Sequence, residues 1–150
     1  MVVMEGNNVN VSAILKQKGR GITTARPTVT LMEVANKLAA KRIGAIVIVG
    51  AGGEVAGIIS ERDIIRALSM HGPDCLELPV SQSMTKKVVT CKETDTLHEL
   101  MAMMTERRFR HLPVVTDGAL VGIISIGDVV KHYVVEMQTE ATAIREYIAH

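Results

Sequence analysis

Two short motifs place a hydroxyl group and a carboxylate at a fixed spacing. Ser60 and Asp63 follow the triplet Gly-Ile-Ile, and Ser125 and Asp128 follow a second copy of it. In the first turn of a helix, such a serine caps the free N–H groups and the acid suits the helix dipole. The same geometry also suits a ligand, because a helix N-terminus receives anionic or hydroxylated groups and a carboxylate can accept both hydroxyls of a ribose. The two interpretations are compatible, and the motif alone does not decide between them.

Basic side chains precede the second motif. Arg108, Arg110 and His111 stand just before a predicted strand, and Lys87 lies further upstream. Such cations are suited to charge-assisted hydrogen bonds with phosphate. The alternative is that they stabilise the end of the preceding helix through its dipole, which is the interpretation we prefer for Arg107. His111 fits equally well as a half-buried histidine with partners inside the protein.

The residue sets that catalysis requires are missing. The five histidines lack metal-ligand spacing, and there is no Gly-x-Gly-x-x-Gly, Walker-type or Gly-x-Ser-x-Gly loop. Cys75 and Cys91 form no Cys-x-x-Cys and have no general base nearby in the sequence, so we expect reduced thiols that pack as small hydrophobes. We therefore predict no catalytic residue, no metal site and no enzymatic activity.

An internal repeat positions the two motifs. Shifted by about 65 residues, segment 57–63 lies over 122–128 and segment 42–49 lies over 108–115. Thr30 and Thr96 are the expected N-caps of an amphipathic helix in each copy. Each copy is predicted to contain a short extended segment (21–24; 87–91), that helix (31–38; 97–104), two strands (45–49 and 55–59; 112–115 and 120–124) and a second helix from the serine.

The order β-α-β-β-α, twice over, predicts an α/β (α+β) fold. One copy alone buries too little apolar surface to be stable, so the two copies should pack together. We assign residues 11–71 to repeat 1, 72–79 to a connector, 80–136 to repeat 2 and 137–150 to an extended C-terminal helix.

An apolar stripe continues beyond the second motif at spacings typical of a helical seam. Such a stripe should be buried, and we favour a second chain over the body of the same chain as its partner. Ala141 weakens the middle of the seam. The stripe consists of Val130, Val134, Met137, Ala141, Ile144 and Ile148.

Composition argues against several classes of protein. The 17 Lys and Arg nearly balance the 16 Asp and Glu, and aromatic residues make up only 2% of the 150 residues. This argues against nucleic-acid binding through a basic face or through base stacking. The longest nearly apolar run, 43–51, is too short for a bilayer, and the N-terminus lacks the features of a signal peptide. We expect a cytoplasmic protein with no membrane partner.

Taken together, the two copies resemble a tandem CBS domain, the cystathionine-β-synthase regulatory module. The resemblance rests on both Gly-Ile-Ile-Ser-x-x-Asp segments and on segment 108–115, and it covers residues 11–136. It implies a pseudo-twofold pair of repeats with two clefts, each lined by parts of both copies. The first cleft would join Ser60, Asp63, Lys87, Val88, Arg108, Arg110 and His111. The second would join Ser125, Asp128, Ile22, Thr23, Arg42, Gly44 and Ala45.

The resemblance also implies the ligand. In each cleft the aspartate would hold a ribose, strand edges and aliphatic side chains would sandwich the base, and cations would face phosphate. AMP, ADP, ATP, NAD(H) and S-adenosylmethionine all offer adenine and ribose, and the sequence does not choose among them. Because the first cleft is richer in cations, we expect it to take the more highly charged ligand.

We therefore predict a non-catalytic regulatory, signal-transducing module that binds an adenine nucleotide between its repeats. As a homodimer, it would pass its state to an effector protein in trans. The alternative is a structural or protein-interaction dimerisation disc with no physiological nucleotide. The family module also occurs in inosine monophosphate dehydrogenases, but this chain has no room for their catalytic barrel.

Overall fold

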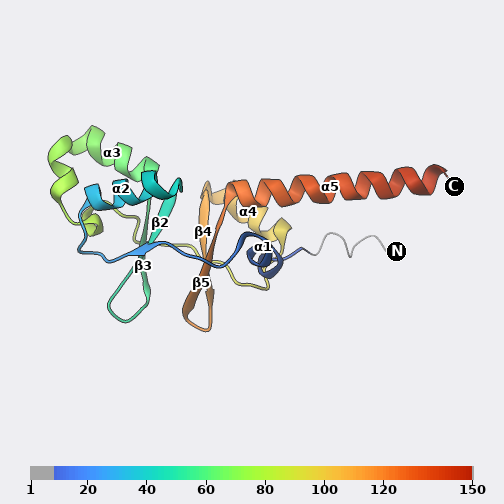
Figure 1. The fold of residues 1–150 in the computed structure, drawn as a ribbon, viewed down its shortest axis with the longest axis horizontal. Coiled ribbons are helices and arrows are strands. Elements are labelled where there is room, and N and C mark those ends of the chain that lie inside the picture. The colour runs from blue at the N-terminus through green and yellow to red at the C-terminus, as the bar shows by residue number, and fades with distance from the viewer. Residues whose placement is uncertain (1–8, 150) are drawn as a thin grey trace. The chain divides into compact units, whose positions relative to one another are not determined.

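The computed structural model describes residues 9–149, which form two compact units (Figure 1). We call residues 21–89 with 117–120 the Asp63 unit, and 9–20 with 90–116 and 121–149 the Asp128 unit. The units do not coincide with the predicted repeats 11–71 and 80–136, because the first segment of each repeat, 11–20 or 80–89, packs with the rest of the other one. Those boundaries therefore describe units of sequence rather than of packing.

The Asp63 unit combines a three-stranded sheet with two helices. Strand β1 runs parallel to β2, and β2 runs antiparallel to β3, with Ala45 opposite Ser60 in the ladder. The β-branched run of β2 favours a strand, and Gly53 adopts a positive φ in the turn that follows. The elements are β1 (Thr24–Ala25), α2 (Leu31–Lys41), β2 (Ala45–Val49), β3 (Val55–Ser60), α3 (Glu61–His71), η2 (Pro73–Glu77) and η3 (Val80–Gln82).

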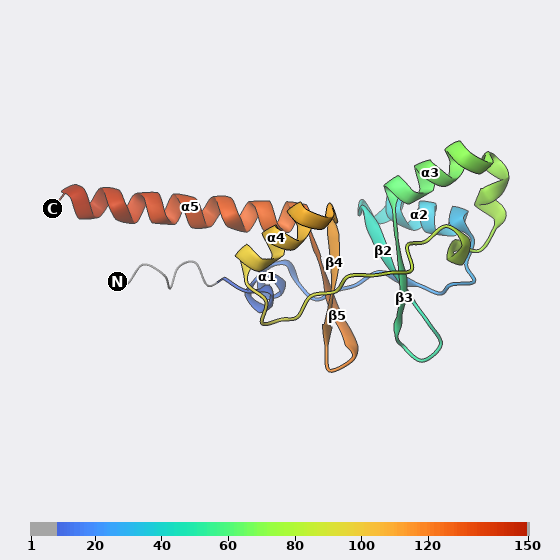
Figure 2. The same ribbon diagram turned by 180° about the vertical axis from the view of Figure 1, so that it is seen from behind.

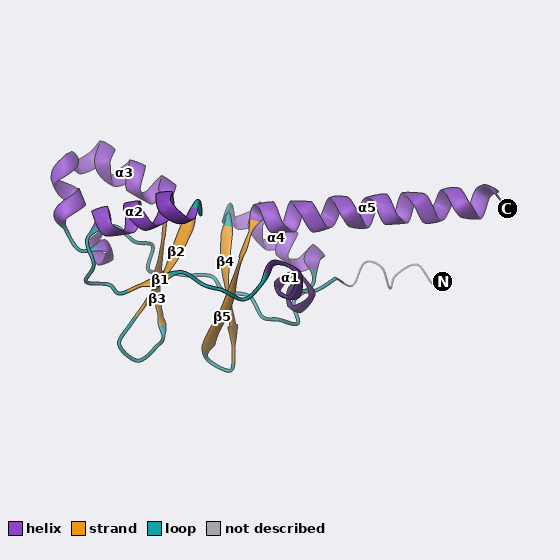
Figure 3. Ribbon diagram, in the orientation of Figure 1, coloured by secondary structure: helices purple, strands orange, loops and turns teal. Residues whose placement is uncertain are grey.

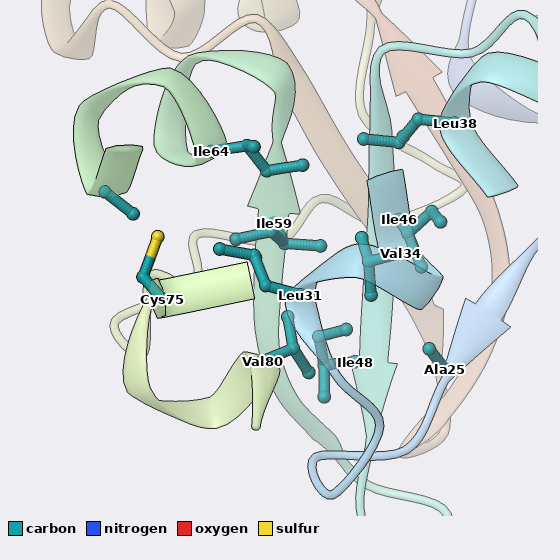
Figure 4. Packing of buried hydrophobic residues seen from close by; sticks show 11 residues of the cluster. Ala25, Leu31, Val34, Leu38, Ile46, Ile48, Ile59, Ile64, Cys75 and Val80 are labelled. Carbon is teal, nitrogen blue, oxygen red and sulfur yellow. The ribbon is translucent and has the colours of Figure 1, made fainter. Parts of the chain in front are cut away.

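The core of the Asp63 unit lies between its helices and its sheet (Figure 4). Leu31 and Val34 of α2 are fully buried with Ile46 and Ile48 of β2. Each such side chain stabilises the fold by about 1.5–3 kcal/mol relative to exposure. The predicted connector, 72–79, is not a plain linker: its 3₁₀ turn η2 buries Cys75 in the same cluster.

The Asp128 unit packs three helices with a two-stranded ladder, β4–β5. Figures 2 and 3 show α4 beside the first part of α5, which then runs on past it as one continuous helix. His98 of α4 meets Tyr133 of α5 edge to face, with ring centroids 6.5 Å apart. The elements are α1 (Val11–Lys18), α4 (Leu97–Arg107), β4 (His111–Thr116), β5 (Ala119–Ser125) and α5 (Ile126–Ala149). The extended C-terminal helix is confirmed, and residue 150 lies outside the described residues.

Local signals in the sequence set the ends of α2 and α4. The hydroxyls of Thr30 and Thr96 accept hydrogen bonds from the N–H groups of Glu33 (3.1 Å) and Glu99 (3.2 Å), so both predicted caps are confirmed. At the opposite ends, the C-cap residues Arg42 and Arg108 adopt left-handed backbones, with φ of 54° and 58°. Glycine is the usual residue there.

The two predicted extended segments differ from what is observed. The first was predicted over 21–24, but the observed strand β1 begins at Thr24 and ends at Ala25. Segment 87–91 forms no regular strand; Cys91 alone makes an isolated parallel bridge to Val114. The physical reason is local: the N–H of Val88 donates to the carbonyl of Lys86 (3.1 Å), and this bond withdraws it from a ladder. The other predicted strands are confirmed, with bounds that shift by one residue at most.

A segment crosses closely over the glycine of each Gly-Ile-Ile triplet. In the Asp63 unit, a Cβ on Gly57 would lie 2.5 Å from Sδ of Met84 and 2.9 Å from the carbonyl oxygen of Thr85. In the Asp128 unit, a Cβ on Gly122 would lie 2.6 Å from Cδ2 of Leu15 in α1. Both positions therefore require glycine for close approach, but only Gly57 faces main chain.

We predict that Gly57→Ala destabilises the protein by about 1–3 kcal/mol, because the added methyl group collides with the main chain of Thr85, which cannot rotate away. Gly122→Ala is the matched variant and should cost less, since the end of the Leu15 side chain can move. Urea denaturation at neutral pH measures both. Equal losses, or a larger loss for Gly122→Ala, would contradict this account.

Candidate functional site

The first motif forms a reciprocal capping box at the start of α3. Oδ2 of Asp63 accepts hydrogen bonds from the N–H (2.9 Å) and the hydroxyl (3.0 Å) of Ser60. In return, Oγ of Ser60 accepts the N–H of Asp63 at 3.3 Å. These bonds fix the carboxylate, which is only 9% exposed. The N–H of Glu61 donates to the carbonyl of Gly44 (3.1 Å), so the loop before β2 lies against the motif.

The second motif repeats this arrangement at the start of α5. Oδ2 of Asp128 accepts the N–H of Ser125 at 2.8 Å, and Oγ of Ser125 accepts the N–H of Asp128 at 3.1 Å. The N–H of Ile126 donates to the carbonyl of Arg110 (2.8 Å), so Arg110 holds the place that Gly44 holds in the first motif. The two motifs make the same main-chain contacts, but the residue that accepts the helix N–H is glycine in the first and arginine in the second.

The two carboxylates have different cationic neighbours. Lys18 of α1 donates to Oδ2 of Asp128 at 2.6 Å and to the carbonyl of Ile123 at 2.9 Å. Among residues 9–149, the one cation that pairs with Asp63 is Arg66, whose Nη1 lies 3.5 Å from Oδ1. The Arg66 side chain is 61% exposed, and an exposed pair of that length contributes little.

The lysine also changes the acidity of Asp128. Burial alone raises the pKa of this carboxyl group, but the hydrogen bond and charge of Lys18 and the bonds from Ser125 outweigh it. The net effect is a pKa below the ordinary value of 3.8. Asp128 is therefore held as a carboxylate.

The structure brings some of the predicted site residues together. The main-chain contacts join Ser60 and Asp63 to Gly44 and Ala45, and they join the Ser125 motif to Arg110. The predicted clefts instead combine residues of both units, and this grouping stays a prediction. Ile22, Thr23, Arg42, Lys87 and Val88 lie in the Asp63 unit, and Arg108 and His111 lie in the Asp128 unit. The cationic side chains are exposed, namely those of Arg42, Lys87, Arg108 and Arg110. His111 is half-buried at the start of β4.

Sequence reasoning missed three charged residues that form ion pairs. Besides Lys18 and Arg66, it missed Glu93, which pairs with Arg20 at 2.7 Å. The hydrogen bond from the Thr116 hydroxyl (2.8 Å), followed by that from Arg20, lowers the pKa of Glu93. The signal available for Lys18 was its place in the repeat: it stands just upstream of the first copy's extended segment, where the second copy has an apolar residue.

The family model described as CBS domain matches this chain twice, over residues 18–70 and 79–135. The chain belongs to the CBS domain family. A CBS-domain containing protein of Agrobacterium tumefaciens is 46% identical and superposes with a TM-score of 0.82, covering 86% of this chain and 96% of that one. The fold predicted from the repeat, a CBS pair with a C-terminal helix, is therefore confirmed.

Two other solved CBS proteins were crystallised with adenosine compounds. A CBS domain protein of Pyrobaculum aerophilum, complexed with AMP, is 31% identical with a TM-score of 0.72, covering 80% of this chain and 89% of that one. The CBS domain pair of protein MJ0100, complexed with 5′-methylthioadenosine and S-adenosylmethionine, is 27% identical with a TM-score of 0.75, covering 83% and 95%. Within residues 9–149, no helix is long and apolar enough to cross a membrane, and no three metal-ligating side chains cluster.

We predict that Lys18 and Asp128 are coupled by about 0.5–1 kcal/mol at neutral pH, since both side chains are partly exposed. A double-mutant cycle with Lys18→Met and Asp128→Asn, measured by urea denaturation, gives this value. Because the folded pKa of Asp128 is depressed, the coupling is fully present above the ordinary pKa of 3.8 and is lost as the pH falls through the lower folded value. A coupling that persists unchanged in acid would contradict this assignment.

Proposed function

We propose that this CBS pair is a non-catalytic regulatory module that binds an adenosine-type ligand at its Ser-x-x-Asp motifs. The observation that carries the proposal is the rigid capping box of Ser60 and Asp63. The box leaves Oδ1 of Asp63 with one hydrogen-bond donor among the described residues, Nη1 of Arg66 at 3.5 Å, so this oxygen is available to accept a ribose hydroxyl. The AMP and S-adenosylmethionine complexes of its structural neighbours support the ligand class.

The surroundings of the motifs suit the rest of a nucleotide. Gly44 is small and lies against the start of α3, where a sugar can approach the main chain. The exposed cations Lys87, Arg108 and Arg110 are available for phosphate. Among the adenosine compounds, we propose AMP, ADP, ATP or NAD(H), bound in clefts between the two repeats, with the bound state passed to an effector protein in trans.

Cysteine chemistry supports a role without catalysis. Burial, with a further contribution from the charge of Asp95, raises the pKa of Cys91 to about 12. The nucleophilic thiolate is therefore scarcely populated at neutral pH. Cys75 is buried as well, and both are free thiols. Two free thiols fit a reducing compartment, and we propose the cytoplasm.

We predict saturable micromolar binding of at least one of AMP, ATP, NADH and S-adenosylmethionine, measured by isothermal titration calorimetry on protein free of bound nucleotide. Binding should be lost in one of the variants Asp63→Ala and Asp128→Ala, because the carboxylate holds the ribose. Asp95→Ala is the control, since the carboxylate of Asp95 belongs to neither motif and accepts the N–H of Lys92. No heat with any of the ligands would reject the nucleotide-binding proposal and favour the dimerisation disc.

A second chain is the partner we propose for the apolar face of α5. The corresponding helix positions are exposed in both repeats: Ile65 and Met70 on α3 match Val130 and Val135 on α5. Further along α5, Ile144 is exposed as well. An apolar face that recurs at matching positions of a duplicated unit suits a self-complementary contact with a second copy of the chain.

We predict that the protein is a dimer and that the double variant Val134→Glu, Ile144→Glu shifts it to a monomer, because charges would be buried in the apolar contact. Light scattering coupled to size-exclusion chromatography measures the mass. Gln138→Glu adds one such charge to the same helix outside the stripe and should leave the dimer intact; it is compared with each single variant of the pair. A wild-type monomer, or a dimer unaffected by the double variant, would contradict the proposal.

A further inference from the structure

The two Ser-x-x-Asp motifs differ in what crosses the strand before them. The 66-residue shift that aligns 22–24 with 88–90 places Lys18 over Met84. In the Asp63 unit, the carbonyl of Ile58 accepts the main-chain N–H of Thr85 at 2.9 Å. In the Asp128 unit, the corresponding carbonyl, of Ile123, accepts the ammonium group of Lys18 at 2.9 Å. A lysine side chain thus replaces a main-chain contact in one copy alone.

This replacement brings a cation to one carboxylate. With Ile123 holding the ammonium group from one side, Lys18 reaches Oδ2 of Asp128 at 2.6 Å. The two side chains are 32% and 21% exposed, so solvent screens the pair only in part. At the matching place in the other copy, Met84 is apolar and packs against the core. Asp63 therefore keeps a carboxylate whose pairing cation among the described residues, Arg66, is mostly exposed and lies 3.5 Å away.

Lys18 makes Asp128 a poorer acceptor for a ribose than Asp63. A sugar hydroxyl binds a carboxylate by donating to it, and a lysine ammonium group, which has donors only, competes for the same oxygens. Oδ2 accepts two donors in each motif, but the second donor is the neutral hydroxyl of Ser60 at Asp63 and the ammonium group of Lys18 at Asp128. The positive charge of Lys18 also weakens Oδ1 of Asp128 as an acceptor. A ribose can use both oxygens only by displacing Lys18, which would leave a partly buried ammonium group without its carboxylate.

We infer that Lys18 determines which motif takes the ligand: it closes the Asp128 motif to a ribose, so the protein binds its adenosine-type ligand at Asp63. This inference rests on the proposed function and goes beyond it, because it assigns the ligand to one of two motifs with the same sequence. It also differs from the expectation drawn from the sequence, in which the cleft with more cations takes the more highly charged ligand.

The test compares Lys18→Met with wild type by calorimetry, with AMP and S-adenosylmethionine as probes. Wild type should bind one ligand per chain, and Asp63→Ala should abolish that binding. Lys18→Met should bind a second ligand. In the Asp63→Ala background, Lys18→Met should restore binding. Its affinity should be at least about tenfold higher than that of Asp63→Ala alone, because one charge-assisted hydrogen bond contributes about that factor.

Matched variants separate the pair from other effects. Lys16→Met removes an exposed lysine from the same helix and should leave stoichiometry unchanged. Lys18→Gln keeps a long polar side chain without the charge and should open the second site as Lys18→Met does. Adding Asp128→Ala to Lys18→Met should close the site again. Thermal unfolding checks that each variant is folded.

The outcomes decide the inference separately from the proposed function. Two sites in wild type, or no added site in both folded Lys18 variants, would overturn the role of Lys18. If in that case wild type still binds one ligand through Asp63, the proposed function stands without a role for Lys18. If wild type binds neither probe but Lys18→Met binds through Asp128, the closure by Lys18 is supported. If neither wild type nor any Lys18 variant binds, both fail.

Discussion

The arrangement of the chain depends on the close crossing of one segment over the glycine of each Gly-Ile-Ile strand. Leu15 lies over Gly122, and Met84 with the main chain of Thr85 lies over Gly57. A side chain at Gly57 would hold the main chain of Thr85 away from the strand, and one at Gly122 would displace the end of the Leu15 side chain. The crossing is what assigns 9–20 to the Asp128 unit and 79–89 to the Asp63 unit, so each repeat completes its core with a segment from outside it. It also decides which side chain reaches the start of the following helix.

In the proposed function, the Ser-x-x-Asp motif uses different atoms of the same carboxylate for the helix cap and for the ligand. In the first copy, Oδ2 of Asp63 closes the capping box, an interaction that contributes about 1 kcal/mol to helix stability. Because the box fixes Oδ2, it also fixes the direction of Oδ1, and a site held in this way loses little freedom when a ligand binds. The structural and the ligand-binding interpretations of the sequence are therefore not in competition: the cap is the reason that the carboxylate is oriented before any ligand arrives.

The features that the sequence predicted correctly are each determined by residues close together in the chain. The caps at Thr30 and Thr96, the β-branched strand Ala45–Val49 and the continuous helix to Ala149 each follow from local pattern. The contact of Lys18 with Asp128 joins residues far apart in the chain, and no local pattern indicates it. The left-handed Arg42 and Arg108 were missed because arginine has no preference for that backbone. Glu136 was also missed: it is 7% exposed with no hydrogen-bond partner among the described residues, on a face of α5 where an apolar side chain is the ordinary choice.

Duplication gave this chain two motifs of one sequence, but their chemistry is set by residues outside them. Ser60 with Asp63 and Ser125 with Asp128 have the same main-chain partners and nearly the same distances. The difference arises upstream, where one crossing segment brings an ammonium group and the other a thioether. A regulatory module gains from such inequality, because a ligand shifts an equilibrium only through different affinities for different states. In the proposed function, the carboxylate paired with Lys18 is the unliganded side, so a ligand at Asp63 would change one half of the module while the salt bridge of Lys18 and Asp128 stabilises the other.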